Sequence, residues 1–323
     1  MRITQITSYA LLLFIGISTV ACTQTQRSIA FYNVENLFDT QDDPNKDDQE
    51  FLPEAEREWN TERYNEKLKH INEVFELFES PLIIGVCEIE NEQVVRDVVN
   101  YGKLKSKYGV VHYESLDNRG IDVALIYDSS SLKLSASGFV RYAMPEGDSP
   151  SRDIVWAKLL QGKDTIVAMV NHWPSRSGGE EKSEPKRLIA ANAARKFIDS
   201  LQKASPTAKI VFMGDLNDYP TNTSAKMIAE VLTPMITKES GAYKGSYNYR
   251  GDWDVLDHIM VSSNFIAKKK STVVSNSGKI YSNDFLLNEY KGDILPFRTY
   301  GGTKYLGGYS DHLPVSIGIS TGK

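Results

Sequence analysis

The stretch Lys209–Asn217, which reads Lys-Ile-Val-Phe-Met-Gly-Asp-Leu-Asn, carries the pattern on which the fold depends. A short apolar run rich in β-branched and aromatic residues is typical of a buried strand. This run ends at a glycine, and an acid and an amide follow it. The stretch therefore predicts a strand that delivers two polar side chains, Asp215 and Asn217, at its end.

The same pattern recurs along the chain. Further strands are predicted at Ile29–Val34, Leu82–Cys87, Ile121–Tyr127, Thr165–Val170, Leu256–Val261 and Leu313–Ile319. Acids, amides and imidazoles stand beside their ends, namely Asn33, Glu35 and Asn36, Glu88, Asn171 and His172, Asp257 and His258, and Asp311 and His312. A sheet that brings these ends together would build one polar cluster on a rigid scaffold.

Helices are fewer than strands. Apolar residues at helical spacing predict helices over Glu62–Glu79 and Glu184–Gln202, with weaker candidates at Glu92–Tyr101 and Ser224–Leu232. Long loops are expected at Phe38–Asn60 and Asn276–Gly308, and loops of that length in a compact domain are often functional. No repeat or linker interrupts the pattern, so residues 29–323 are expected to form one catalytic domain.

The N-terminus has the pattern of a targeting segment. Arg2 precedes a short apolar run that is too short for a comfortable membrane span, so residues 1–21 are predicted to be a signal peptide. Cys22 is predicted to be lipidated, with residues 22–28 as a tether. The protein would then be an exported periplasmic or outer-membrane lipoprotein, anchored to the membrane by its lipid. A plain secretory signal, giving a secreted protein, is the alternative.

Composition limits the classes of function. The chain has 323 residues, of which 41% are hydrophobic and 24% charged, as in ordinary soluble proteins. Its net charge of −5 argues against a protein held on nucleic acid by bulk positive charge. This net charge is still compatible with an enzyme that binds a few phosphates through local positive charges. If Cys22 is acylated, Cys87 has no disulfide partner, and it is predicted to be a small buried hydrophobe. Nothing implies an obligate protein partner, so a monomer is expected.

The polar residues at the strand ends suit a hard cation. Mg²⁺ prefers carboxylate and amide oxygens plus water, and the cluster offers Asn33, Glu35, Glu88, Asp215, Asn217 and Asp311. Zinc fits less well, because the chain has neither a thiolate cluster nor a histidine pair at ligand spacing. His172 and His312 could donate to a phosphate, and Asp257 could orient His312 and keep it protonated. Taken singly, each of these residues has a structural explanation, so the joint pattern carries the prediction.

Five segments together resemble the endonuclease/exonuclease/phosphatase superfamily and occur in its order. They are Phe31–Leu37, Gly85–Asn91, Gly214–Asp218, Leu256–Ile259 and Ser310–Val315. A bacterial, often exported, nuclease-like subgroup is similar in Asn171–Arg176 with Gly178 and Gly179, in Arg119–Ala124, and in Gly245–Tyr247 leading to Trp253.

The resemblance implies an α/β (α+β) fold, a four-layer sandwich of two packed mixed β-sheets flanked by helices. It implies that Glu88 is the principal metal ligand, helped by Asn33, Glu35 and Asp311, with Mg²⁺ as the cofactor, Mn²⁺ as a substitute and Ca²⁺ as a further option. Water would attack the phosphorus in line. The implied catalytic roles are water positioning for Asp215, phosphate binding for Asn217, and transition-state stabilisation for His172 and for His312 paired with Asp257. Either Asp215 or the Asp257–His312 pair could be the base.

Other residues are candidates for binding substrate. Arg119, Arg152 and Arg176 are candidate phosphate clamps, with surface charge as the alternative. Tyr247 and Trp253 could stack on bases, although packing within the protein is the commoner fate of such aromatic residues.

We expect a divalent-metal-dependent phosphodiester hydrolase, an endonuclease on DNA or RNA. The first alternative is a phosphatase or phospholipase C-type enzyme on inositol phosphates or sphingomyelin. A non-catalytic protein that binds a phosphorylated ligand ranks below both, because every expected catalytic acid and histidine is present.

Overall fold

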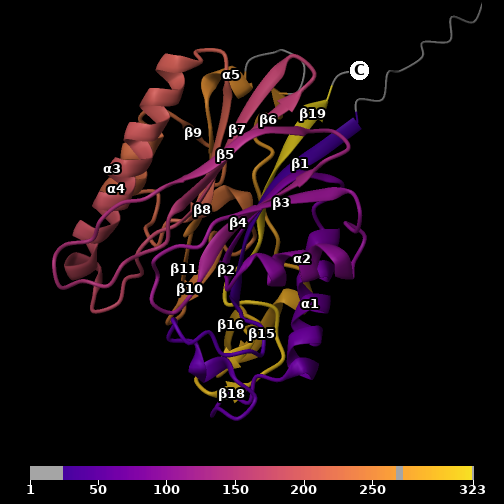
Figure 1. The fold of residues 1–323 in the computed structure, drawn as a ribbon, viewed down its shortest axis with the longest axis vertical. Coiled ribbons are helices and arrows are strands. Elements are labelled where there is room, and N and C mark those ends of the chain that lie inside the picture. Colours follow the sequence, from indigo (N-terminus) through magenta and orange to yellow (C-terminus); the bar gives the residue numbers. More distant parts are fainter. Residues whose placement is uncertain (1–24, 267–271, 322–323) are drawn as a thin grey trace, which may run out of the picture.

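Two β-sheets pack face to face, and helices cover their outer faces (Figure 1). The computed structural model describes residues 25–266 and 272–321. The first sheet has the order β13-β19-β1-β2-β4-β3, with β14 also paired to β19. Its strands are β1 (Thr25–Leu37), β2 (Pro81–Ile89), β3 (Tyr108–His112), β4 (Asp122–Asp128), β13 (Thr272–Val273), β14 (Lys279–Ile280) and β19 (Val315–Thr321).

The second sheet has the order β5-β6-β7-β8-β12-β9. Its strands are β5 (Lys133–Val140), β6 (Ile154–Gln161), β7 (Asp164–His172), β8 (Lys209–Asp215), β9 (Thr233–Pro234) and β12 (Asp257–Val261). Three separate hairpins are β10 (Tyr247–Tyr249) with β11 (Asp252–Asp254), β15 (Leu287–Tyr290) with β16 (Asp293–Pro296), and β17 (Tyr300–Gly301) with β18 (Lys304–Tyr305).

The helices form the two outer layers. They are α1 (Thr61–Glu76), α2 (Glu92–Tyr101), α3 (Glu180–Ala204), α4 (Thr223–Ala229) and the short α5 (Ser263–Ile266), with 3₁₀ turns η1 (Gln49–Phe51), η2 (Lys238–Ser240) and η3 (Asp284–Leu286). In Figure 1, α1 and α2 lie on one side of the sandwich and α3 and α4 on the other. This arrangement confirms the predicted four-layer fold.

Each sheet has a parallel pair of strands at its centre. β1 runs parallel to β2 and β7 parallel to β8, whereas the other pairings are antiparallel. α1 connects the first pair and α3 the second. Between the sheets, Gly85 of β2 lies so close to Met213 of β8 that a β-carbon on Gly85 would be 2.7 Å from the sulfur. This close packing brings the carboxyl ends of all four central strands to one edge of the sandwich.

The structure corrects several expected boundaries. β1 begins at Thr25, so residues 25–28 belong to a strand paired with β19 and not to a tether. Residues 1–21 and Cys22 lie outside the described residues, so the predicted signal peptide and lipidation are still predictions. α3 begins at Glu180, four residues before the expected start. No helix in the described part of the chain combines the length and apolar character that a membrane crossing needs.

Further differences concern strands that the sequence analysis did not predict. β3 and β5 were not predicted because they lie at the edges of their sheets, and β5 is largely exposed. β6, next to β5, was also missed. The expected loop Asn276–Gly308 instead contains β14, η3 and two hairpins, whose short strands are mostly exposed and therefore carry little apolar signal.

Candidate active site

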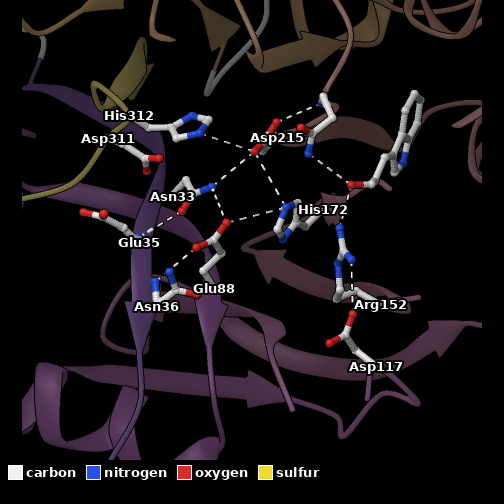
Figure 2. A network of polar contacts seen from close by, with 12 residues as sticks. Asn33, Glu35, Asn36, Glu88, Asp117, Arg152, His172, Asp215, Asp311 and His312 are labelled. Atoms are coloured by element: carbon white, nitrogen blue, oxygen red, sulfur yellow. Dashed lines mark hydrogen bonds and ion pairs between the residues drawn. The ribbon is translucent and has the colours of Figure 1, made fainter. Parts of the chain in front are cut away.

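The polar residues predicted at the strand ends meet in one cluster (Figure 2). Asn33, the last residue of β1 before its pairing with β2 shifts register, lies at the centre of the cluster. The Asn33 Nδ2 atom donates to Glu88 Oε1 at 3.2 Å and to Asp215 Oδ2 at 3.1 Å. Asn33 therefore joins a carboxylate from the first sheet to one from the second.

Irregular backbone aims these side chains into the cluster. The β1–β2 pairing shifts register between Asn33 and Leu37, and the β2–β4 pairing shifts between Cys87 and Ile89. Glu35 and Glu88 lie within these irregularities, with φ angles of 52° and 61°. Left-handed backbone is uncommon outside glycine and is concentrated at functional sites, where surrounding structure holds it in place. Alternation along a regular strand would have pointed these carboxylates elsewhere.

The second sheet supplies Asp215, at the end of β8. Asp215 Oδ1 accepts a hydrogen bond of 2.8 Å from the backbone N–H of Asn217, which also has left-handed backbone, with φ 50°. Just before it, Gly214 lies against β7, and a β-carbon there would be 2.3 Å from the carbonyl oxygen of Asn171. Burial raises the pKa of Asp215 to about 7, although His312 opposes the effect. Asp215 is thus a buried carboxyl group whose orientation is fixed by a backbone hydrogen bond.

His312 is paired with Asp257, as the sequence predicts. His312 Nδ1 lies 2.8 Å from Asp257 Oδ2, and its Nε2 lies 3.6 Å from Asp215 Oδ2. Burial alone would lower the pKa of His312, but the carboxylates of Asp257 and Asp215 outweigh burial and hold it well above its usual range. The imidazole is therefore a cation that can donate from Nε2 into the cluster.

His172 differs from His312 in charge. Its Nε2 atom lies 3.8 Å from Glu88 Oε1 and 3.7 Å from Asp215 Oδ2, and its Nδ1 is buried and has no hydrogen-bond partner among the described residues. Burial lowers the pKa of His172 well below its usual value, and the positive charges of Arg152 and Arg119 add to this effect. The two histidines thus face Asp215 as one neutral and one positively charged donor.

Glu35 and Asp311 lie on the other side of Asn33. Arg298 lies 2.6 Å from Asp311 Oδ2 and 3.5 Å from Glu35 Oε1, and the N–H of Thr299 donates to Glu35 Oε2 at 2.6 Å. Burial raises the pKa of Glu35 to about 7, and the neighbouring Asp311 adds to it. Carboxylates held close together are a fitting donor set for a hard divalent cation. A second group of possible metal ligands consists of Asp215, Asp257 and His312. In this group His312 and Asp257 are already hydrogen-bonded to each other.

A cleft of about 750 Å³ opens over the cluster. It is lined by Glu88, Arg119, Arg152, His172, Ser175, Arg176, Ser177, Gly178, Gly179, Glu180, Asp215, Asn217, Tyr219, Tyr247, Tyr249, Leu256, Asp311 and His312. Four of the five predicted catalytic residues, His172, Asp215, Asn217 and His312, therefore line one cleft together with most of the predicted substrate-binding residues, and the fifth, Asp257, is buried behind His312.

A sequence profile of the Endonuclease/Exonuclease/phosphatase family matches residues 28–321. The chain belongs to this family. Members are divalent-metal-dependent phosphoesterases, and the buried carboxylates fit that chemistry. The protein is accordingly a metal-dependent phosphoesterase.

Solved structures show the same fold at low sequence identity. A mannosyl-6-phosphatase from Bacteroides thetaiotaomicron is 14% identical, with a TM-score of 0.58, covering 91% of this chain and 99% of that one. The human nocturnin catalytic domain with bound sulfate is 16% identical, with a TM-score of 0.56, covering 92% and 95%. A family protein from Bacteroides thetaiotaomicron is 15% identical, with a TM-score of 0.58, covering 93% and 99%. No curated protein matches the sequence.

The three predicted arginine clamps have different surroundings. Arg119 is half exposed at the cleft, with Asp117 at 3.6 Å. Arg152 is buried beneath His172, donating to Asp117 Oδ2 at 3.2 Å and to the carbonyl of Trp173 at 2.6 Å (Figure 2). Arg119 thus has the freer guanidinium for a phosphate of the substrate, whereas Arg152 supports the site from below.

Arg176 is held mainly by the protein. Its guanidinium donates to the carbonyl of Asn217 at 2.8 Å, contacts Asp218 and Glu180, and stacks 3.8 Å above the ring of Tyr219. These contacts indicate that Arg176 also positions the Asn217 loop, and because it lines the cleft its predicted role as a phosphate clamp is still a prediction.

The two predicted aromatic contacts also separate. Tyr247 lines the cleft, with its ring centroid 4.7 Å from that of His312. Trp253 does not line it. Its ring stacks on Tyr243 at 4.9 Å and packs against the core, which is the packing role that was the alternative to base stacking. The sequence reasoning correctly placed Cys87 in the core, where burial raises the pKa of its thiol.

Sequence reasoning missed two cations of the site, Lys67 and Arg298. Lys67 on α1 is 1% exposed, and its Nζ donates to Thr299 Oγ1 at 2.5 Å and to the carbonyl of Tyr309 at 2.6 Å. Burial lowers the pKa of Lys67 to about 8, although Glu35 opposes the effect. Neither residue follows a strand that the sequence predicts, since Lys67 lies on α1 and Arg298 lies in the expected loop Asn276–Gly308, so the strand-end pattern carries no signal for them.

Proposed function

We propose that this phosphoesterase is an endonuclease that hydrolyses phosphodiester bonds in DNA or RNA. The observation that carries the proposal is the shape of the cleft: it extends beyond the polar cluster, to Arg119 at one wall and to Tyr249 at another. A phosphodiester needs room for a substituent on each side of the phosphate, and a cleft of about 750 Å³ offers it.

Asn33, Glu35, Glu88 and Asp311 are the proposed ligands of Mg²⁺, or of Mn²⁺ in its place, and Ca²⁺ is a further option. A bound divalent cation would polarise the phosphate oxygens and offset their charge. Two of the proposed ligands are already oriented by hydrogen bonds, because Asn33 donates to Glu88 and the Thr299 N–H donates to Glu35.

The chain's own groups divide the remaining work. Asp215 is the proposed acceptor for the proton of the attacking water, because it is buried, fixed by the Asn217 N–H and raised in pKa to about 7. The positively charged His312 donates from Nε2 to the developing phosphorane charge. Asn217 binds the phosphate, and neutral His172 donates from the opposite side. A general base contributes typically about 10²–10⁴-fold to a rate.

A phosphatase that acts on a small phosphomonoester is the second candidate. The half-exposed Arg119 favours it, because a guanidinium at the cleft wall can bind a terminal phosphate in a bidentate way. Its product would be inorganic phosphate, whereas an endonuclease releases shorter oligonucleotides and no free phosphate.

A substrate panel separates these candidates. We would incubate purified protein, with and without Mg²⁺, with single- and double-stranded DNA, RNA, a generic phosphodiester, an inositol phosphate and sphingomyelin. His312→Ala protein purified in parallel would reveal contaminating activity. Metal-dependent shortening of internally labelled DNA or RNA is expected. Release of phosphate from the inositol phosphate, with nucleic acid left intact, would exclude the endonuclease.

Export and anchoring at Cys22 are also part of our proposal. Growth with a labelled fatty acid should label the wild-type protein and leave Cys22→Ser unlabelled. An unlabelled wild-type protein in the culture medium would instead indicate the plain secretory signal.

A further inference from the structure

Two hairpins beside the cleft share the same four-residue turn. The tip of β10–β11 reads Tyr249-Arg250-Gly251-Asp252, and the tip of β15–β16 reads Tyr290-Lys291-Gly292-Asp293. In each, the tyrosine pairs with the aspartate across a two-residue loop. Both loop residues have positive φ, 55° and 94° in the first and 55° and 89° in the second. This geometry is that of a type I′ turn, in which the second position favours glycine.

The tyrosines and the cations of these turns are presented to solvent together. Tyr249 is 54% exposed and Tyr290 is 57% exposed. The Arg250 guanidinium lies 5.2 Å from the centroid of the Tyr249 ring, and the Lys291 ammonium lies 5.2 Å from that of Tyr290. Each tip therefore offers a flat aromatic ring with a positive charge beside it.

The two tips are neighbours and adjoin the cleft. β10 contacts β16, and a β-carbon on Gly251 would lie 4.0 Å from Asp293 Oδ2. In Figure 1 the two hairpins lie next to each other at the same end of the sandwich. Tyr249 itself lines the cleft. A substrate chain that leaves the cleft past Tyr249 would next meet the tip that carries Tyr290.

We propose that these paired tips bind a single-stranded segment of nucleic acid outside the cleft. An exposed aromatic ring stacks on a base of any sequence, provided that the base is unpaired, and an adjacent cation binds the phosphate. Asp252 and Asp293 leave each tip with no net charge, so stacking dominates over bulk electrostatics. The inference rests on the proposed nuclease function and narrows its substrate to single strands.

The test compares substrates of two lengths. For Tyr290→Ala, KM for a single-stranded 12-mer should rise about tenfold, whereas KM for a dinucleotide, which is too short to reach this tip, should stay unchanged. Tyr290→Phe should restore the wild-type KM, because it keeps the ring. Tyr101→Ala removes a comparably exposed tyrosine from α2 and is the matched control. Lys291→Ala should make the slope of log K against log salt concentration less steep for the 12-mer, by the amount that corresponds to about one phosphate contact.

Direct binding separates a failure of this inference from a failure of the proposed function. A fluorescent single-stranded 12-mer is titrated into His312→Ala protein with and without Tyr290→Ala. Loss of binding in the double variant would support the proposed binding of single strands by the tips, even if the wild-type enzyme cleaves no nucleic acid. Equal binding by both proteins would overturn the inference, and so would stronger binding of a duplex. If Tyr290→Ala instead abolished co-sedimentation with anionic vesicles and left oligonucleotide binding intact, the tips would belong to a membrane contact.

Discussion

Carboxylates at the two ends of the first sheet have pKa values that are shifted in opposite directions. At the cleft end, burial raises the pKa of Glu35 to about 7. At the other end, Asp128 accepts hydrogen bonds from Arg27, Ser130 and Ser131. Burial alone would raise the pKa of Asp128 too, but these hydrogen bonds outweigh it and lower the pKa to about 2.

The difference lies in how completely each carboxylate is satisfied by the protein. Asp128 has an arginine at 2.6 Å and two hydroxyl donors, so its charge is satisfied within the fold. At the cleft end, acids from both sheets gather around one amide, Asn33. Such a cluster costs stability unless a cation joins it. The cleft end of the sheet is thus suited to an added cation, whereas the carboxylate at the opposite end is neutralised by the protein itself.

The largest expected effect comes from removing the metal. Chelation should abolish phosphodiester hydrolysis, and Mg²⁺ or Mn²⁺ should restore it, because the cleft end depends on an added cation. Glu88→Gln should weaken the binding of metal, measured by calorimetry. Asp128→Asn is the control at the other end of the sheet and should leave metal affinity unchanged. Full activity in excess chelator would contradict the comparison.

The next effect concerns His312. His312→Ala should lower kcat about 10²–10³-fold, since removal of one donor to a developing oxyanion has about that cost. The matched control is His112→Ala, because His112 also contacts a buried aspartate, Asp122, at 3.1 Å, but lies on β3 outside the cleft. Circular dichroism would verify the fold of both variants. Similar losses of kcat in both would show that buried histidine–aspartate pairs matter here only for stability.

Local pattern was enough to predict much of the site. The strand runs, the helices at Glu62 and Glu92, and the polar residues after the strands are all visible over a few residues. The order of the layers and the roles of the site residues were predicted from the resemblance of five short segments to the endonuclease/exonuclease/phosphatase superfamily. The meeting of Asn33, Glu88 and Asp215 agrees with that prediction, although the bulged, left-handed backbone at Glu88 has no signature in the sequence.

The rest depends on contacts between distant segments. Lys67 looks like an ordinary surface lysine on a helix, yet its partners lie more than 230 residues away, at Thr299 and Tyr309. The hydrogen bond of Arg176 to the carbonyl of Asn217 likewise joins segments that lie 41 residues apart in the chain. Whether such a side chain is buried or paired with a charge depends on how distant segments pack together. A periodic pattern within one short segment cannot reveal it.

A smaller effect is expected from Lys67→Met. Lys67 holds Thr299, whose N–H orients Glu35, so its loss should weaken Mg²⁺ binding about 10–100-fold, as is typical for groups that support a metal ligand. Calorimetric titration of the protein with Mg²⁺ would measure this. Lys69→Met is the control, because Lys69 is an exposed lysine of the same helix. Loss of thermal stability with unchanged metal affinity would assign Lys67 a purely structural role.

The smallest effect concerns the opposite end of the sheet. Because the pKa of Asp128 in the folded protein lies below its ordinary value, the stability that its carboxylate contributes is present above about pH 4 and is lost as the pH falls toward 2. The contribution should be on the order of 1 kcal/mol after solvent screening. Urea unfolding of wild type and Asp128→Asn between pH 2 and 6 would measure it, and the variant should have the flatter profile. Adding Mg²⁺ should not change this difference, because the Arg27–Asp128 pair is already complete. A difference that disappeared with Mg²⁺ would show that the two ends of the sheet are coupled.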